Sequence, residues 1–207
     1  MQSSSFERFA GTLSLLAGVA TFLYAVAFIL FPLLLNRQDA LLAALFLLLI
    51  GLLATAPLVA IYRRLMERDG AFALWALLLG VVSATGTAIH GGYDLANAIN
   101  PPAAAYLNLP SQIDPRGILT FGFMSMALFT IGWIIGRGGR FPRGLGYLGI
   151  VSATLLLLLY LGRLTFLEAT SPYILVPAVL EGFIVGPAWW VWLGVALLRS
   201  PNGGSGS

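Results

Sequence analysis

The chain has no cysteine, no lysine and a single histidine, His90. Without cysteine, it has no disulfides, no thiol catalysis and no iron–sulfur cluster held by thiolates. Without lysine, it cannot form the Schiff base that attaches retinal or pyridoxal phosphate. One histidine is too few for a bis-histidine haem within one chain or for a metal centre built from several imidazoles.

Charged residues are also scarce, at 9% of the chain, whereas hydrophobic residues make up 59%. Soluble domains carry about a quarter charged residues. No soluble fold of this size hides so much apolar surface, so the composition predicts an integral membrane protein. The basic excess of three does not indicate a nucleic-acid partner, because the arginines stand at the ends of apolar runs and orient the protein in the membrane.

Six apolar runs are long enough for helices that cross a bilayer, which takes about 20 residues each. They cover 9–35, 40–65, 71–99, 115–136, 145–167 and 172–198. The predicted fold is all-α, a polytopic membrane bundle of about six transmembrane helices in one domain, residues 1–201. The tail 202–207 has the composition of a flexible linker. Asp114-Pro115 and Ser171-Pro172 each place a capping residue before a proline at the first helical position.

Arginine placement predicts the orientation of the bundle. With six spans, both termini and the second and fourth loops share one side, which receives eight of the eleven arginines. Basic residues favour the cytoplasmic side, so both termini are expected in the cytoplasm. All five tryptophans fall toward the same side, as an interfacial aromatic belt does. The arginine runs at 63–68 and 137–143 are expected to contact lipid headgroups.

Small residues mark candidate contacts between helices. In the third span they recur every four residues, at Gly80, Ala84, Ala88 and Gly92. Such spacing lets two backbones approach closely in a membrane. In the sixth span, Pro177 and Pro187 are expected to bend the helix, because proline removes a backbone hydrogen bond.

Ionisable residues inside membrane spans are costly and indicate functional sites. Four stand out: His90 and Asp94 in the third span, Arg163 in the fifth and Glu181 in the sixth. Their depths place all four in the outer half of the membrane. His90 and Asp94 are four residues apart, so they share a helix face on which the carboxylate can orient the imidazole.

The other residues of the expected site follow from helix geometry. Tyr93 and Asn97 extend the polar face of the third span. Counting outward from a tight turn near Thr170 places Tyr160 opposite Glu181, with Arg163 about one helical turn above. The predicted ligand-binding site is an outward-facing cavity with the loop 100–114 as its lid, lined by His90, Tyr93, Asp94, Asn97, Tyr160, Arg163 and Glu181.

Structural roles explain the same residues in a different way. His90 and Asp94 then make a hydrogen bond that only satisfies buried polar groups, as any fold in lipid requires. Arg163 then extends to the outer interface. Glu181 lies too deep for its side chain to reach the interface, so its carboxyl group must be paired, protonated or in contact with water. A metal centre of His90, Asp94 and Glu181 lacks characteristic spacing, so no metal is assigned and the cofactor stays unknown.

The segment Phe141-Pro142-Arg143-Gly144-Leu145-Gly146-Tyr147-Leu148-Gly149 resembles the junction between the fourth and fifth helices of an uncharacterised bacterial membrane-protein family, domain of unknown function 4386. The opening Phe6-Glu7-Arg8-Phe9-Ala10-Gly11, followed by a Leu-rich span, is similar too. The resemblance implies a six-helix protein of the bacterial inner membrane. It carries no activity, because the family has none established.

Three functions are compatible with these observations. The leading hypothesis is a protein that binds a small ligand or lipid in the outer cavity, as sensor or carrier. The second is an intramembrane enzyme with His90 or Glu181 as general base. The third is a structural or pigment-binding subunit of a larger membrane complex, with His90 ligating a tetrapyrrole. Membrane lipid is the expected partner, and a homo-oligomer or a larger complex stays open.

Overall fold

The computed structural model describes residues 5–35, 39–101, 116–166 and 171–199, and within these ranges it contains helices and no strand. Six helical spans are long and apolar enough to cross a membrane, which confirms the predicted all-α bundle and an integral membrane protein. The spans are α1 (Ser5–Ala25) with η1 (Val26–Leu30) and α2 (Phe31–Leu35); α3 (Ala40–Leu65); α4 (Gly70–Ile99); η3 (Ile118–Gly122) with α5 (Phe123–Gly136); α6 (Arg143–Thr165); and α7 (Pro172–Leu180) with η4 (Glu181–Val185) and α8 (Gly186–Leu198).

The helix starts follow local chemistry. Asp39 and Asp69 cap α3 and α4, each accepting a hydrogen bond from a backbone N–H in the first turn. Pro172 is the first residue of α7, as predicted, but the Ser171 side chain makes no capping hydrogen bond. The second predicted start, Asp114-Pro115, lies outside the described residues.

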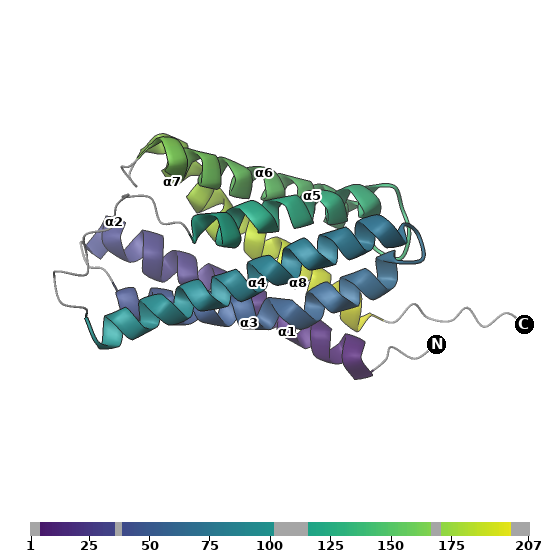
Figure 1. Ribbon diagram of the computed structural model, residues 1–207, viewed down its shortest axis with the longest axis horizontal. Helices are drawn as coiled ribbons and strands as arrows, with labels where there is room; N and C mark the ends of the chain where they lie inside the picture. Colours follow the sequence, from purple (N-terminus) through teal and green to yellow (C-terminus); the bar gives the residue numbers. More distant parts are fainter. Residues whose placement is uncertain (1–4, 36–38, 102–115, 167–170, 200–207) are drawn as a thin grey trace, which may run out of the picture.

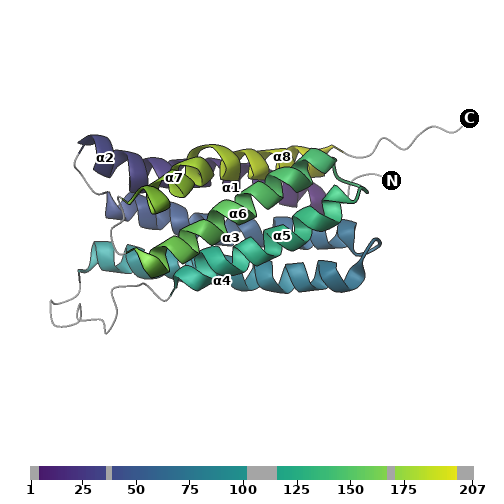
Figure 2. The same ribbon diagram turned by 90° about the horizontal axis from the view of Figure 1, so that it is seen from above.

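Figures 1 and 2 show the spans lying side by side in one bundle, and their contacts form a closed ring. Each span packs against the next one along the chain, and α1 closes the ring by packing against α8. Buried serines join neighbouring spans, since Ser14 donates to the Trp190 carbonyl and Ser125 to the Ala153 carbonyl. Such bonds help to hold helices together where lipid removes the hydrophobic drive between them.

Glycine allows the closest approaches between spans. Gly91 of α4 meets the backbone at Leu48 of α3, where an added Cβ atom would collide. Gly92, which the spacing favoured, lies in ordinary contact instead, with its nearest α3 atom 3.9 Å from where a Cβ would stand. The row contacts α3 as predicted at Gly80, Ala84 and Ala88. The contact is looser at Gly92 because the helix face turns by about 100° per residue, so a four-residue period drifts off the contact line.

Three spans contain a π-helical turn, in which each hydrogen bond skips one more residue than in an α-helix. Two of these turns, η1 and η4, end two residues before a proline, Pro32 and Pro187. Proline clashes with the carbonyl four residues earlier, and a wider turn relieves this clash. The bend predicted for the sixth span therefore takes the form of a local π turn.

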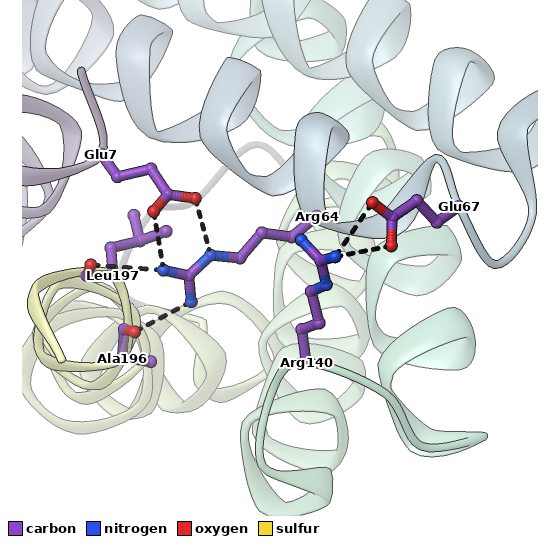
Figure 3. A network of polar contacts seen from close by, with 6 residues as sticks. All are labelled: Glu7, Arg64, Glu67, Arg140, Ala196 and Leu197. Carbon is purple, nitrogen blue, oxygen red and sulfur yellow. Dashed lines mark hydrogen bonds and ion pairs between the residues drawn. The ribbon is translucent and has the colours of Figure 1, made fainter. Parts of the chain in front are cut away.

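α1 begins and α8 ends at the same end of the bundle (Figure 1). We call this the basic end, because the arginine-rich segments 63–68 and 137–143 lie there. The run 63–68 was expected to contact lipid headgroups, and this was wrong for Arg64. Its side chain is buried among helix ends. Its guanidinium donates to both carboxylate oxygens of Glu7 and to the carbonyls of Ala196 and Leu197 (Figure 3).

Candidate functional site

His90 and Asp94 form a pair on one face of α4, as their spacing predicts. The imidazole Nε2 lies 3.4 Å from the Asp94 Oδ2 atom. The other ring nitrogen, Nδ1, lies 2.9 Å from the Thr120 hydroxyl in η3. His90 therefore links α4 to the π-helical turn that opens the next span.

Arg116, two residues before η3, completes the group. One guanidinium nitrogen lies 3.0 Å from the Asp94 Oδ1 atom and 3.3 Å from the His90 carbonyl. The guanidinium also stacks over the Tyr93 ring, 4.7 Å from its centroid, in a cation–π contact. We call His90, Asp94, Arg116 and Thr120 the His90 cluster.

The hydrogen bonds of the His90 cluster depend on where the imidazole carries its protons. The Thr120 hydroxyl can donate its proton to the Arg116 carbonyl, 3.2 Å away, or to His90 Nδ1, 2.9 Å away. A neutral imidazole with its single N–H group at Nε2 donates to Asp94 and accepts from Thr120 at Nδ1. A protonated imidazole donates to Thr120 and Asp94 at once. The cluster can therefore exist in two hydrogen-bonded states.

The cluster is only partly buried. The His90 side chain is 13% exposed, whereas Arg116 is 25% exposed and Asp94 39% exposed. The charged groups of Arg116 and Asp94 can thus meet a molecule from outside the chain while they hold each other.

Glu181 forms a separate polar site in the middle of the sixth span. Its Oε1 atom accepts a hydrogen bond of 2.6 Å from Ser152 of α6. Its Oε2 atom is buried and has no hydrogen-bond partner in the described part of the chain. The same holds for the indole nitrogen of Trp189, which lies against Gly149, one helical turn from Ser152. Unpaired buried polar atoms are rare and indicate strain or function.

The predicted register between the fifth and sixth spans was wrong. Gly162 packs against Tyr173 and Ile174, and Glu181 lies beside Ser152 rather than opposite Tyr160. α6 ends at Thr165 and α7 begins at Pro172, so the midpoint of the connection falls before Thr170. If the centre of the turn is misplaced by one residue, the residue expected opposite Glu181 is misplaced by two.

The structure divides the predicted site residues. His90, Tyr93 and Asp94 lie together with Arg116. Tyr160 packs near Gly122 of η3, on the α6 side of that turn. The side chains of Asn97 and Arg163 make no polar contact with another described residue. The loop expected to act as a lid lies mostly outside the described residues.

Three polar partners of the predicted site residues were missed from the sequence. Arg116 was counted only for orientation, and Thr120 and Ser152 were not considered. Threonine and serine are common in membrane helices, where they bond their own backbone, so neither stands out. Arg116 carried a signal, because an arginine near the start of one span can meet a carboxylate near the end of the preceding antiparallel span.

No group of three histidine, cysteine or acidic side chains within the described ranges could hold a metal ion. Glu181 bonds Ser152, while His90 and Asp94 bond each other, Thr120 and Arg116. No protein-family model, curated protein or solved structure matches this chain. The function must therefore be argued from the arrangement of the polar residues.

Proposed function

We propose that this membrane protein binds a small polar ligand or a lipid headgroup at the His90 cluster and acts as a sensor or carrier. One observation carries the proposal: four polar side chains from two spans converge, yet the charged pair of Arg116 and Asp94 stays partly exposed. If these groups served stability alone, we would expect the burial and full hydrogen bonding seen at Arg64.

The charges of the cluster indicate the class of ligand. Arg116 suits an anionic group such as phosphate or carboxylate, because the guanidinium plane can donate two parallel hydrogen bonds. Asp94 suits a donor such as an amine. A zwitterion with an anionic group and an ammonium group fits both, as in phosphoethanolamine, whether free or as the headgroup of a lipid.

The π-helical turns support a role in which binding moves a helix. Thr120 lies within η3, and Glu181 opens η4. π turns occur often at functional sites, and they leave helices with weaker local hydrogen bonding. A ligand that draws Asp94 or Arg116 toward itself would loosen the link between α4 and η3. In a sensor this loosening would be the signal of ligand binding, and in a carrier it would be the first conformational change.

The test uses three phosphate probes with two kinds of headgroup, ethanolamine and choline, which differ in their N–H groups. Phosphoethanolamine and phosphatidylethanolamine offer N–H donors to Asp94, whereas phosphatidylcholine offers none. We expect the ethanolamine probes to bind to the wild type. Asp94→Asn should weaken their binding by roughly tenfold or more, which is the usual effect of losing a hydrogen bond to a charged group. Binding is measured by titration of purified protein, and the soluble headgroup and the lipid distinguish the two sources.

Asp39→Asn is the matched control, because Asp39 is a capping carboxylate at the same end of the bundle. Equal losses in both variants would contradict the proposal. Equal binding of phosphatidylcholine would also contradict it, because the headgroup amine would then be irrelevant.

An intramembrane enzyme is the second candidate, on one specific observation. Thr120, His90 and Asp94 form a chain of hydroxyl, imidazole and carboxylate, with distances of 2.9 Å and 3.4 Å. A nucleophile, a base and a group that orients the base have this order. We expect covalent labelling of the wild type by a fluorophosphonate if this is the function, and no labelling of Thr120→Val. An unlabelled wild type would leave ligand binding as the better account.

We also propose that the basic end lies in the cytoplasm of a bacterial inner membrane, as the arginine distribution and the family resemblance suggest. The cysteine-free chain allows a simple test. A cysteine at Asn100 should react with an impermeant maleimide added to intact spheroplasts, while a cysteine at Gln2 should not. The reverse pattern would invert the orientation.

A further inference from the structure

A cavity of about 210 Å³ lies at the basic end, where the ends of α3 and α8 meet the start of α6. Its wall includes three arginines, Arg64, Arg140 and Arg199, together with Pro142 and Trp192. A water molecule takes about 30 Å³ in the liquid, so the cavity has room for about seven waters or a phosphate group. Guanidinium groups with free donors beside such a volume suit a phosphate.

Arg64 forms the fixed part of the wall. Its side chain is 5% exposed, and its donors are held by Glu7 and by two carbonyls at the end of α8. Its positive charge is matched by the Glu7 carboxylate. Arg64 therefore shapes the cavity, and the charge that attracts a ligand must come from other residues.

Arg140 and Arg199 supply that charge. Arg140 pairs with Glu67, but both side chains are about half exposed or more, and exposed ion pairs contribute little. Arg199 follows α8, and its side chain makes no hydrogen bond or ion pair with another described residue. Three arginines and two carboxylates, Glu7 and Glu67, leave the cavity with one positive charge in excess.

The start of α6 adds to the attraction for anions. Pro142 is the N-cap residue of this helix and lies in the cavity wall. No side chain caps the helix, so its first N–H groups and the positive end of its dipole remain available to an anion.

We propose that this cavity binds the phosphate group of an anionic membrane lipid. A lipid is favoured over free phosphate by the surroundings of the cavity. Trp192 lines the cavity, and other exposed side chains on the same helices are apolar or aromatic, among them Val191 and Leu198 on α8 and Tyr147 on α6. Acyl chains can lie along this surface while the headgroup meets the arginines, which is how basic pockets between membrane helices recognise lipids. This site is independent of the His90 cluster, which lies at the other end of the helices.

Native mass spectrometry of the purified protein, titrated with phosphatidylglycerol and separately with phosphatidylcholine, tests the inference. We expect phosphatidylglycerol to bind more tightly, and Arg199→Gln and Arg140→Gln each to weaken it about fivefold. Arg63→Gln is the matched control, because Arg63 is exposed at the same end and lies outside the cavity wall. Thermal unfolding of each variant checks that the fold is intact.

Three results would overturn the inference. Equal binding of the two lipids would remove the role of headgroup charge. An equal loss in Arg63→Gln would show a general surface potential rather than a site. If millimolar inorganic phosphate displaced the lipid, and the protein bound phosphate and lipid with equal affinity, the cavity would be a site for free phosphate instead.

Discussion

At the basic end, the Arg64 side chain is 5% exposed and is held by Glu7 and two backbone carbonyls. At the other end, Asp94 is 39% exposed and is shared by His90 and Arg116. Both groups join the ends of neighbouring spans through charge. The first is sealed inside the protein, whereas the second keeps part of its charge accessible.

The difference indicates two uses of charge in one bundle. A sealed ion pair fixes how helix ends meet, because removing either partner leaves a buried charge unpaired. A partly exposed pair adds little to stability, so its presence in a chain with 9% charged residues calls for another explanation. Ligand binding provides one. The predictions below test this contrast, starting with the largest expected effect.

Arg64→Met should destabilise the protein by about 3–5 kcal/mol, because Glu7 and two carbonyls lose their donor inside the protein. The adjacent Arg63→Met should change stability by less than about 0.5 kcal/mol, since that side chain is exposed. Reversible unfolding in bicelles measures both. Glu7→Leu combined with Arg64→Met should recover part of the loss. Similar losses at 63 and 64 would remove the contrast between the two ends.

Gly91→Ala should destabilise the α3–α4 contact beside the His90 cluster by about 1–3 kcal/mol, because the new methyl group meets the backbone at Leu48. Gly92→Ala provides the control, with its nearest α3 atom at 3.9 Å. The same unfolding assay applies. If the two variants were equally stable, the close approach of α3 and α4 at Gly91 would be wrong.

Thr120→Val should lower the free energy of unfolding by about 0.5–1.5 kcal/mol, the usual net value of a hydrogen bond. Valine keeps the shape of the side chain but loses the hydrogen bonds to His90 and to the Arg116 carbonyl. Thr130→Val is matched to it, because Thr130 bonds only the Met126 carbonyl of its own helix. We expect a smaller change there. Equal changes would mean that the link between α4 and η3 contributes nothing beyond a local bond.

Asp94→Asn should change stability least, by under about 1 kcal/mol, because the pair with Arg116 is partly exposed. The same unfolding assay measures this. A loss as large as that of Arg64→Met would assign the His90 cluster to stability and would remove the case for a ligand.

Most of the fold could be predicted from the sequence, because lipid requires long apolar helices whose length is fixed by the bilayer. The pairing of His90 with Asp94 also followed, since both residues are on one helix. Contacts between helices did not follow in the same way. Thr120 and Arg116 reach His90 and Asp94 only because η3 packs against α4, and hydropathy does not specify that packing.

Two errors have a common physical cause. Arg64 stands at the end of an apolar run, so its sequence position is the same whether it faces lipid or is sealed by Glu7. Glu181 was placed opposite Tyr160 because a turn was assumed to be centred near Thr170, whereas its partner is Ser152. Both outcomes depend on which helix ends meet, and this is a property of tertiary packing.

Native mass spectrometry of the protein extracted from its own membranes tests the central claim most directly, with Asp94→Asn and Asp39→Asn measured beside the wild type. The account predicts a bound small molecule or lipid on the wild type and on Asp39→Asn that is lost from a folded Asp94→Asn. A wild type without any bound species, or one whose bound species survives Asp94→Asn unchanged, would contradict a ligand site at the His90 cluster.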